Sequence, residues 1–224
     1  MIRIENTGVY GFEAAIRGMR NPMNSWAKSD TEFHGGVVRF DTCNERWEDN
    51  GYVMSLGSND LDLMSRLRNS GTDHRKFMRM ITVTLDIVAP LYWWKEFDTY
   101  KVGTVANSCS TMHKIHAKEF TLEDFSIEHL TMDSEIVLDS VIAYLNAKRT
   151  DFIETNDKGS WWQMIQLLPS SYNQRRTVML NYEVLTNMYK SRRNHKLDEW
   201  HTFCDWIEEL PYSELITNNG NEEL

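Results

Sequence analysis

The order of apolar and polar residues along the chain predicts a few strands and several helices. Ile81–Val88 alternates apolar and polar side chains and is rich in β-branched residues, which is typical of a strand with one buried face. Pro90 follows, and proline is favoured at the start of a helix, so we expect a short aromatic helix over Leu91–Phe97. The first 20 residues fit a short strand and then a helix over Phe12–Met19.

Residues 21–57 contain breaks and are expected to be irregular, and Asn59 or Asp60 can cap a helix that ends near Gly71.

The second half of the chain has a mostly helical pattern. Further helices are expected from Asp133/Ser134 onwards, over Ser160–Leu168, over residues 173–193 and over Leu197–Leu210. The fold class predicted from this pattern is α+β, a small antiparallel or mixed sheet with several long helices.

The chain shows no internal repeat, no low-complexity tract and no long linker rich in proline, glycine or serine. We therefore expect residues 1–224 to form a single domain. Within it, residues 59–210 carry the most interpretable pattern, residues 1–58 form an N-terminal part, and residues 211–224 form a tail.

Composition narrows the class of protein. Hydrophobic residues make up 41% of the 224 positions, and no apolar run reaches the roughly 18 residues of a membrane span. The N-terminus has no apolar signal core, so we expect a cytoplasmic protein without a membrane partner. The net charge of −9 argues against a nucleic-acid polymer as partner.

Cysteine and histidine do not suggest a metal site. Cys43, Cys109 and Cys204 are odd in number and widely spaced, which fits neither a disulfide framework nor a zinc site. His113 and His116 are three residues apart, with no Glu or Cys partner at ligand spacing. We predict no bound metal.

Three basic clusters stand out in this acidic chain, at His74–Arg79, Gln174–Arg176 and Lys190–Lys196. The helix dipole alone could explain the third, because cations are favoured at a helix C-terminus. Three clusters together nevertheless suggest at least one small-anion site, since arginine holds phosphate through a bidentate fork.

The segment Thr104–His116 is polar, short-chained and weakly charged. Small hydroxyl and amide side chains can line a ligand site, and they also favour capped turns. Both interpretations stay open at this point. The glycine-rich motifs of dinucleotide-binding and P-loop proteins, and that of α/β-hydrolases, are absent from the sequence.

These pieces occur in an order that resembles the flavin-dependent thymidylate synthases. A turn over Gly71–Phe77 and the strand precede Ala89–Phe97, which is similar to the family's Ala-Pro and aromatic helix. Thr99–His113 is similar to the family signature, with one residue inserted. Leu168-Pro169 then precedes an Asn-x-Glu-x-x-x-Asn-x-x-x-x-Arg pattern over residues 181–192. The resemblance covers residues 59–210.

The resemblance implies roles for particular positions. In the family, the asparagines of the late helix contact the flavin and its last arginine binds deoxyuridylate. Substrate-binding roles are thereby implied for Arg192, Ser110, Glu96 and Ser108. Cofactor-binding roles are implied for Asn181, Asn187 and Asn107, with Lys101, His74 and Arg75 in place of the family's basic grip on flavin phosphates. The catalytic residues are left unassigned.

The sequence also departs from the family pattern. Thr99-Tyr100-Lys101 stands where the family has Arg-His-Arg, and Glu183 replaces an arginine. The resemblance implies an FAD-dependent methyltransferase that carries out reductive one-carbon transfer to a pyrimidine nucleotide such as dUMP. NADPH and methylenetetrahydrofolate would be co-substrates, and the assembly would be a homotetramer. Two alternatives stay open: a non-catalytic nucleotide-binding or structural protein on the same fold, and a transferase acting on another pyrimidine nucleotide.

Overall fold

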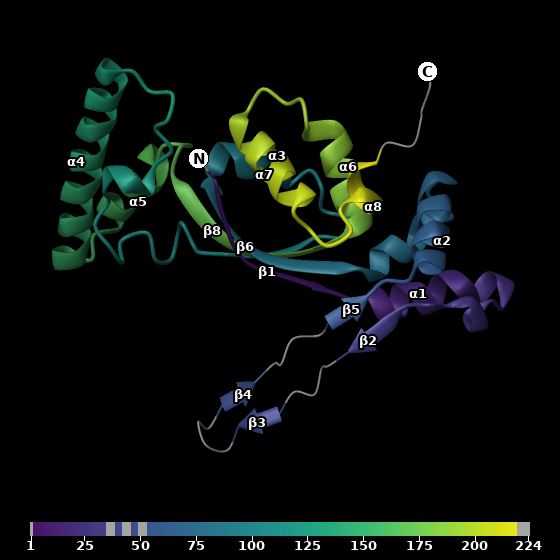
Figure 1. Ribbon diagram of the computed structural model, residues 1–224. Helices are drawn as coiled ribbons and strands as arrows, with labels where there is room; N and C mark the ends of the chain where they lie inside the picture. The colour runs from purple at the N-terminus through teal and green to yellow at the C-terminus, as the bar shows by residue number, and fades with distance from the viewer. Residues whose placement is uncertain (1, 35–38, 42–45, 49–52, 219–224) are drawn as a thin grey trace. The chain divides into compact units, whose positions relative to one another are not determined.

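The computed structural model describes residues 2–34, 39–41, 46–48 and 53–218 (Figure 1). Cys43 lies outside the described residues. The chain divides into two compact units. The first contains residues 2–9 and 82–217, and the second contains residues 10–81 and residue 218. The expectation of a single domain stays a prediction.

A four-stranded sheet organises the first unit, with strand order β1-β6-β8-β7. Its strands are β1 (Arg3–Tyr10), β6 (Thr82–Pro90), β7 (Val105–Ser108) and β8 (Asn173–Asn181). Strand β8 runs antiparallel to both β6 and β7 and pairs Val178 with Leu85 on one side and with Ala106 on the other. The expected strand over Ile81–Val88 and the α+β fold class are confirmed.

One face of this sheet is covered by helices. Val83, Leu85 and Ile87 alternate with partly exposed residues along β6 and are buried. Figure 1 shows the covering helices over this face, namely α3 (Leu91–Phe97), α6 (Tyr182–Arg192), α7 (Asp198–Glu208) and α8 (Glu214–Thr217). Aromatic rings from α3 and α7 make the core, with the Trp93 and Trp200 centroids 4.8 Å apart.

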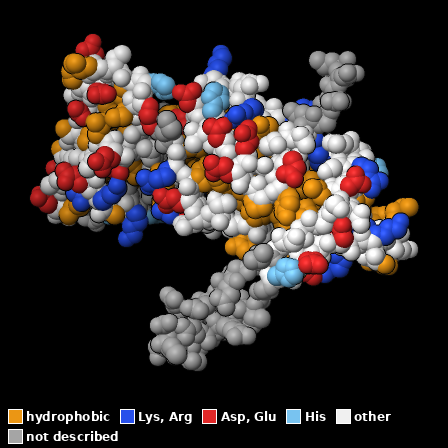
Figure 2. Space-filling view, viewed as in Figure 1, with side chains coloured by type: hydrophobic (Ala, Val, Ile, Leu, Met, Phe, Trp, Pro, Cys, Tyr) orange, Lys and Arg blue, Asp and Glu red, His pale blue; other side chains and the backbone are white. Residues whose placement is uncertain are grey.

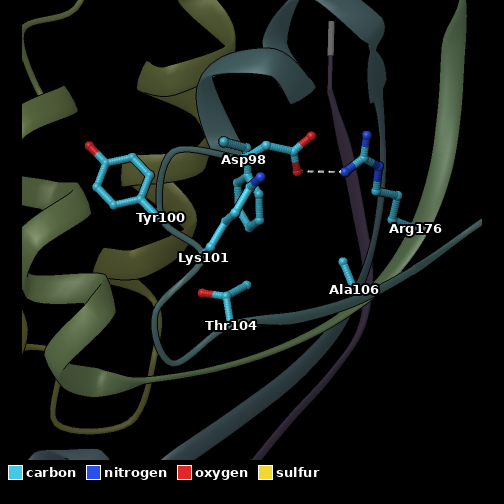
Figure 3. Close-up of a pocket in the computed structure, with 7 residues that line it drawn as sticks. Asp98, Tyr100, Lys101, Thr104, Ala106 and Arg176 are labelled. Atoms are coloured by element: carbon cyan, nitrogen blue, oxygen red, sulfur yellow. Dashed lines mark hydrogen bonds and ion pairs between the residues drawn. The ribbon is translucent and has the colours of Figure 1, made fainter.

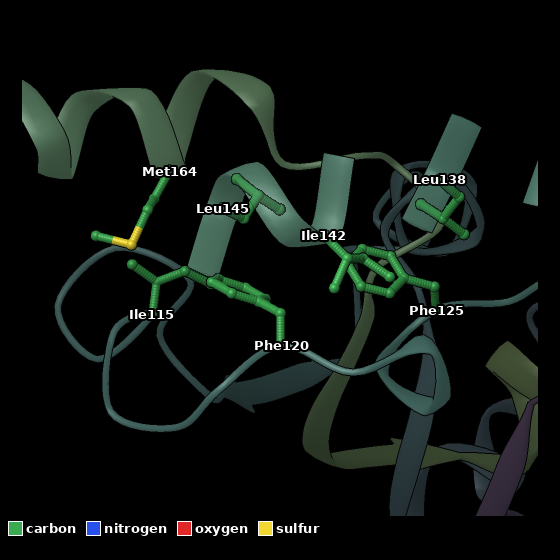
Figure 4. Close-up of a cluster of buried hydrophobic side chains, with 7 residues drawn as sticks. All are labelled: Ile115, Phe120, Phe125, Leu138, Ile142, Leu145 and Met164. Atoms are coloured by element: carbon green, nitrogen blue, oxygen red, sulfur yellow. The ribbon is translucent and has the colours of Figure 1, made fainter. Parts of the chain in front are cut away.

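A second apolar cluster lies at the other end of this unit. Helix α4 (Met132–Thr155) and helix α5 (Lys158–Leu167) enclose it together with the 3-10 turn Leu122–Asp124 and its flanks. Its buried side chains converge in Figure 4 and are Ile115, Phe120, Phe125, Leu138, Ile142, Leu145 and Met164. Both helices were expected from the pattern. None of the described helices is long and apolar enough to cross a membrane.

Among its described residues, the second unit contains two helices and two pairs of short strands. Helix α1 (Phe12–Arg20) begins after Gly11, which has a φ of 94°. A Cβ atom at this position would lie 2.1 Å from the Met80 carbonyl oxygen, so no larger side chain fits there. The other elements are helix α2 (Ser58–Asn69), the 3-10 turns Asn21–Met23, Trp26–Lys28 and Arg75–Met80, and the antiparallel pairs β2 (Glu32–His34) with β5 (Val53–Ser55) and β3 (Arg39–Asp41) with β4 (Arg46–Glu48).

The expectation that residues 21–57 are irregular was therefore wrong for these strands, which have only three residues each. The expected cap of α2 was wrong as well, because Gly57 occupies the N-cap position. Asp60 is buried instead, and its carboxylate contacts Arg20 Nε at 2.7 Å. Burial alone would raise the pKa of Asp60, but hydrogen bonds from Thr31, Ser29 and Arg20 bring that pKa below its usual value.

The helix expected over residues 173–193 was also wrong in its first half. Residues Asn173–Asn181 form strand β8, and only Tyr182–Arg192 is helical. Gln174 and Arg176 occupy inward positions of this strand beside Val178 and Leu180. Two polar residues on the buried side hide the period-two pattern, so the sequence reads as a continuation of the amphipathic helix.

Candidate functional site

A pocket of about 210 Å³ opens beside strands β7 and β8. The segment after α3 supplies most of its lining, and one residue comes from each of the two strands (Figure 3). The lining residues are Phe97, Asp98, Tyr100, Lys101, Thr104, Ala106 and Arg176. All of them belong to the first unit.

Arg176 is the most firmly held side chain of this pocket. Its guanidinium lies over the ring of Trp94, 4.2 Å from the centroid, which is a cation–π geometry. Nε donates to Gln174 Oε1 at 3.0 Å, and Nη1 donates to Asp98 Oδ1 at 2.8 Å. The side chain is only 15% exposed. Arg176 thus presents a fixed positive charge at the pocket wall.

Lys101 is the second cation of the pocket. Its ammonium has no hydrogen-bond or ion-pair partner among the described residues of the chain. Figure 3 shows the side chain extending from its loop toward Asp98. Gly103 lets this loop turn back, since its φ is 80° and a Cβ there would come within 3.1 Å of Asn181 Nδ2. Together the two cations and one carboxylate give the lining a net charge of about +1.

Next to the pocket, Glu96 organises a cluster of polar groups. Its Oε2 accepts hydrogen bonds from Arg192 Nη1 at 2.7 Å and from Trp200 Nε1 at 3.1 Å. Arg192 also donates from Nε to the hydroxyl of Tyr100 at 2.9 Å, and it lies 4.9 Å from the Trp200 ring centroid. Because Tyr100 lines the pocket, this network fixes one of the pocket's walls.

His195 belongs to the same cluster, with Nε2 at 3.2 Å from Glu96 Oε2. The backbone N–H of Leu197 donates to His195 Nδ1 at 3.2 Å, so Nδ1 acts as an acceptor. In the neutral ring the proton is therefore on Nε2, where it faces the carboxylate. His195 belongs to a basic cluster of the sequence, and nothing in that local pattern indicates its contact with Glu96.

The structure brings together only some of the residues that the resemblance pointed to. Glu96 and Arg192 contact each other, and Lys101 lines the adjacent pocket. Asn107 and Ser108 lie exposed on β7. The Ser110 hydroxyl accepts from the backbone N–H groups of Met112 and His113, which makes it the capping group of a turn.

The remaining positions lie elsewhere. Asn181 is the N-cap of α6, and its side chain accepts from the backbone N–H of Val184 at 3.0 Å. Asn187 is exposed on α6. His74 and Arg75 belong to the second unit, where they begin a 3-10 turn. The assignment of these residues to ligands stays a prediction.

The basic cluster Gln174–Arg176 divides between the two faces of the sheet. Arg176 faces the pocket, whereas Arg175 pairs with Asp86 at 2.7 Å and with Glu5 at 3.3 Å. Hydrogen bonds from Thr177, Arg175 and Asn6 hold the pKa of Asp86 well below its usual range. Asp98 and Tyr100 were not singled out as binding residues, because their proximity to Arg176 depends on a pairing between distant strands, whereas Thr104 belongs to the segment that was considered as a ligand-lining loop.

In the described parts of the chain, no group of three His, Cys, Asp or Glu side chains is placed so that it could hold a metal ion. The residues of the pocket are instead suited to an anion. Two cations, one of them rigid, together with the aromatic residue Tyr100 can receive a phosphate joined to a planar or sugar ring.

Comparison with known proteins places the fold. No protein-family model matches the sequence, and no curated protein matches it either. A crystal structure of thymidylate synthase X from Helicobacter pylori with FAD and dUMP is similar at a TM-score of 0.68 and 15% identity, over 97% of each chain. A second structure of the Helicobacter pylori enzyme, complexed with FAD and dUMP, has a TM-score of 0.65 and 15% identity, over 96% of this chain and 97% of the other.

At this identity the likeness shows the fold alone. The chain has the thymidylate synthase X fold over nearly its whole length, in agreement with the expected α+β class. The resemblance stated from the sequence is thus confirmed as a similarity of fold, and the ligands of those two structures enter only as guides to a proposal.

Proposed function

We propose that this protein binds a pyrimidine nucleotide in the pocket lined by Lys101 and Arg176. The observation that carries the proposal is a rigid arginine and a lysine without a partner among the described residues, both on one pocket of a fold shared with a structure that contains dUMP and FAD. The phosphate would lie between the two cations. Tyr100, which is only partly buried, offers aromatic surface for the ring system.

Arg176 suits this role because its geometry is set before any ligand arrives. Stacking on Trp94 and the bond to Gln174 hold the guanidinium, so ligand binding costs little side-chain entropy. Lys101 is exposed and has no partner in the described part of the chain, so it can contact the phosphate as well. A charge-assisted contact of this kind is roughly twice as strong as a neutral hydrogen bond.

A pocket of about 210 Å³ is smaller than the roughly 300–1,000 Å³ typical of drug-sized ligands, so it would hold the phosphate end of the nucleotide, and FAD would lie outside this lining. We propose that a homotetramer completes the site. Bound flavin would supply the hydride and relay the one-carbon unit, with NADPH and methylenetetrahydrofolate as co-substrates. Lys101 and Arg176 would hold phosphate, and Tyr100 would orient the ring beside it.

In this proposal Glu96 and Arg192 act mainly by positioning. Arg192 is engaged with Glu96, Tyr100 and Trp200, and its side chain is 18% exposed. For Arg192 to reach a nucleotide directly, its contact with Glu96 would have to open. In the closed arrangement Arg192 fixes the Tyr100 hydroxyl and thereby the wall of the pocket.

This engagement favours a second candidate, a non-catalytic nucleotide-binding protein on the same fold. An arginine already paired with an internal carboxylate offers less to a substrate than an unpaired arginine does. The two candidates share nucleotide binding and differ in the flavin.

The test is an absorbance spectrum of the purified protein before and after addition of FAD, with the protein recovered by gel filtration, alongside calorimetric titration with dUMP. Stoichiometric flavin and bound dUMP support the enzyme. Bound dUMP without flavin supports the non-catalytic candidate. If dUMP binds neither in the absence nor in the presence of FAD, the proposed function is contradicted.

A further inference from the structure

Asp98 is the one lining residue that opposes an anionic ligand. Its Oδ1 lies 2.8 Å from Arg176 Nη1, and its side chain is 45% exposed. In Figure 3 the carboxylate lies beside the guanidinium that a phosphate would approach. A phosphate bound at Arg176 would therefore be close to a second negative charge, and like charges at such distances repel.

Arg176 does not depend on Asp98 alone for its position. Gln174 and Trp94 each make a separate contact with the same guanidinium. Gln174 is itself buried, and its Nε2 donates to the Cys109 carbonyl at 2.7 Å. The Asp98 carboxylate consequently contributes charge to the pocket more than it contributes structure.

The charge of the lining limits the ligand. Lys101 and Arg176 are the cations among the described lining residues, and Asp98 offsets one of them. A phosphate monoester carries about −1.5 to −2 at neutral pH. Each further phosphate adds negative charge beside Asp98, with no additional cation in the lining to receive it.

We propose that Asp98 determines how many phosphate groups the pocket accepts and selects nucleoside monophosphates over diphosphates and triphosphates. This inference rests on the proposed function, because it concerns the same pocket and the same ligand class. It adds a specificity-determining residue that lies outside the positions implied by the family resemblance.

The experiment measures affinities of a ligand series for wild type and for Asp98→Asn, by calorimetry without divalent cations. The probes are deoxyuridine, dUMP, dUDP and dUTP. Wild type is expected to bind dUMP more tightly than dUTP. The ratio of the affinity of Asp98→Asn to that of wild type should be near one for deoxyuridine, on the order of five for dUMP, and larger for dUTP at low salt.

Two further variants serve as controls. Asp205→Asn removes the same charge from α7, where Asp205 pairs with Arg193 and lies outside the pocket lining. It should leave the ligand preference of wild type unchanged. Asp98→Glu keeps the charge, and it should keep the preference for the monophosphate.

The outcomes separate the inference from the function on which it rests. If dUMP binds but the gain on Asp98→Asn does not increase with phosphate count, the inference is wrong and the proposed nucleotide site stands. If Asp205→Asn shows the same increasing gain, overall charge is the cause and the role of Asp98 is refuted. If no probe binds to any variant, the proposed function is itself overturned.

Discussion

At the scale of single residues, the contact between Arg192 and Glu96 makes a direct prediction about stability. Replacing Arg192 with Met would leave the partly buried Glu96 without its cation, so we expect the free energy of unfolding to fall by about 2 kcal/mol. Urea denaturation measures this change. Arg66→Met breaks an exposed i,i+4 pair with Asp62 and should cost less than about 0.5 kcal/mol. Equal costs for the two variants would contradict the structural role given to Arg192.

The buried thiol of Cys204 should make the stability of the protein depend on pH. Burial raises the pKa of the Cys204 thiol to about 11, above the usual value of 9.0 that applies in the unfolded chain. The folded protein thus holds the proton more tightly, so this stabilisation is complete below pH 9 and is lost as the pH rises toward 11. The free energy of unfolding should fall less steeply over this range in Cys204→Ala than in wild type. Parallel curves for the two proteins would refute the assignment.

The exposed Cys109 offers a contrasting chemical test. Thiolates react with disulfide reagents, and burial keeps Cys204 protonated and covered. At pH 8 Cys109 should react rapidly with a disulfide reagent in the native protein, whereas Cys204 should react only after unfolding. Mass spectrometry of the modified peptides distinguishes them. Modification of native Cys204 at the rate of Cys109 would show that the burial is wrong.

Part of the site could be predicted at this scale and part could not. Lys101, Glu96 and Arg192 were named from the sequence, and the basic cluster that contains Arg176 was recognised as a possible anion site. The partners Asp98 and Trp94 lie about 80 positions away from Arg176 along the chain. No local pattern encodes such contacts, because the pairing of β6 and β7 with β8 creates them.

At the scale of elements, Asn181 joins strand β8 to helix α6. Its side chain accepts from the N–H of Val184 and so satisfies one of the unpaired donors of the first turn. Asn181→Ala should cost about 1 kcal/mol of stability, whereas Asn181→Asp should stay close to wild type because aspartate caps equally well. Thermal or urea unfolding of both variants tests this. A loss of similar size in Asn181→Asp would show that the cap is not the source of the effect.

The success of element prediction depended on how plainly each buried face was apolar. The inward residues of β6 are Val83, Leu85 and Ile87, so the period-two pattern was visible. The bounds predicted for helix α3 agree with the structure at both ends, because Pro90 marks where the helix starts. Strand β8 was missed because its inward residues include Arg176, which lines the pocket, and Gln174, which accepts a hydrogen bond from it. These two polar side chains on the inward face obscured the period-two pattern on which strand prediction relies.

At the scale of the whole molecule, the homotetramer is a prediction from the resemblance. Helix α4 presents apolar side chains on its outer side as well as toward the core, among them Met132, Ile136 and Val137, which are 76%, 58% and 64% exposed. Figure 2 shows apolar and acidic side chains mixed over the end of the molecule formed by α4. Exposed apolar side chains that gather on one helix are typical of a protein–protein contact.

Sedimentation equilibrium tests this expectation. The mass should be four times the 26.4 kDa of the chain, and Ile136→Asp should lower it if this helix contributes to assembly. Asp139→Asn on the same helix is the control, since it keeps the apolar side chains. A monomeric wild-type protein would contradict the predicted tetramer. It would also count against the enzyme as the proposed function and favour the non-catalytic candidate.

The central claim is that a pyrimidine nucleotide binds between Lys101 and Arg176. The most direct test is to measure by calorimetry how tightly dUMP binds to wild type, to Arg176→Gln and to Arg193→Gln. Arg193 contacts Asp205 and Glu208 and lies outside the pocket lining, so its variant controls for overall charge. We predict that Arg176→Gln lowers the affinity by about tenfold or more, because a charge-assisted contact contributes roughly 1.5–3 kcal/mol, and that Arg193→Gln changes it little. Binding of dUMP to Arg176→Gln with the affinity of wild type would contradict the account.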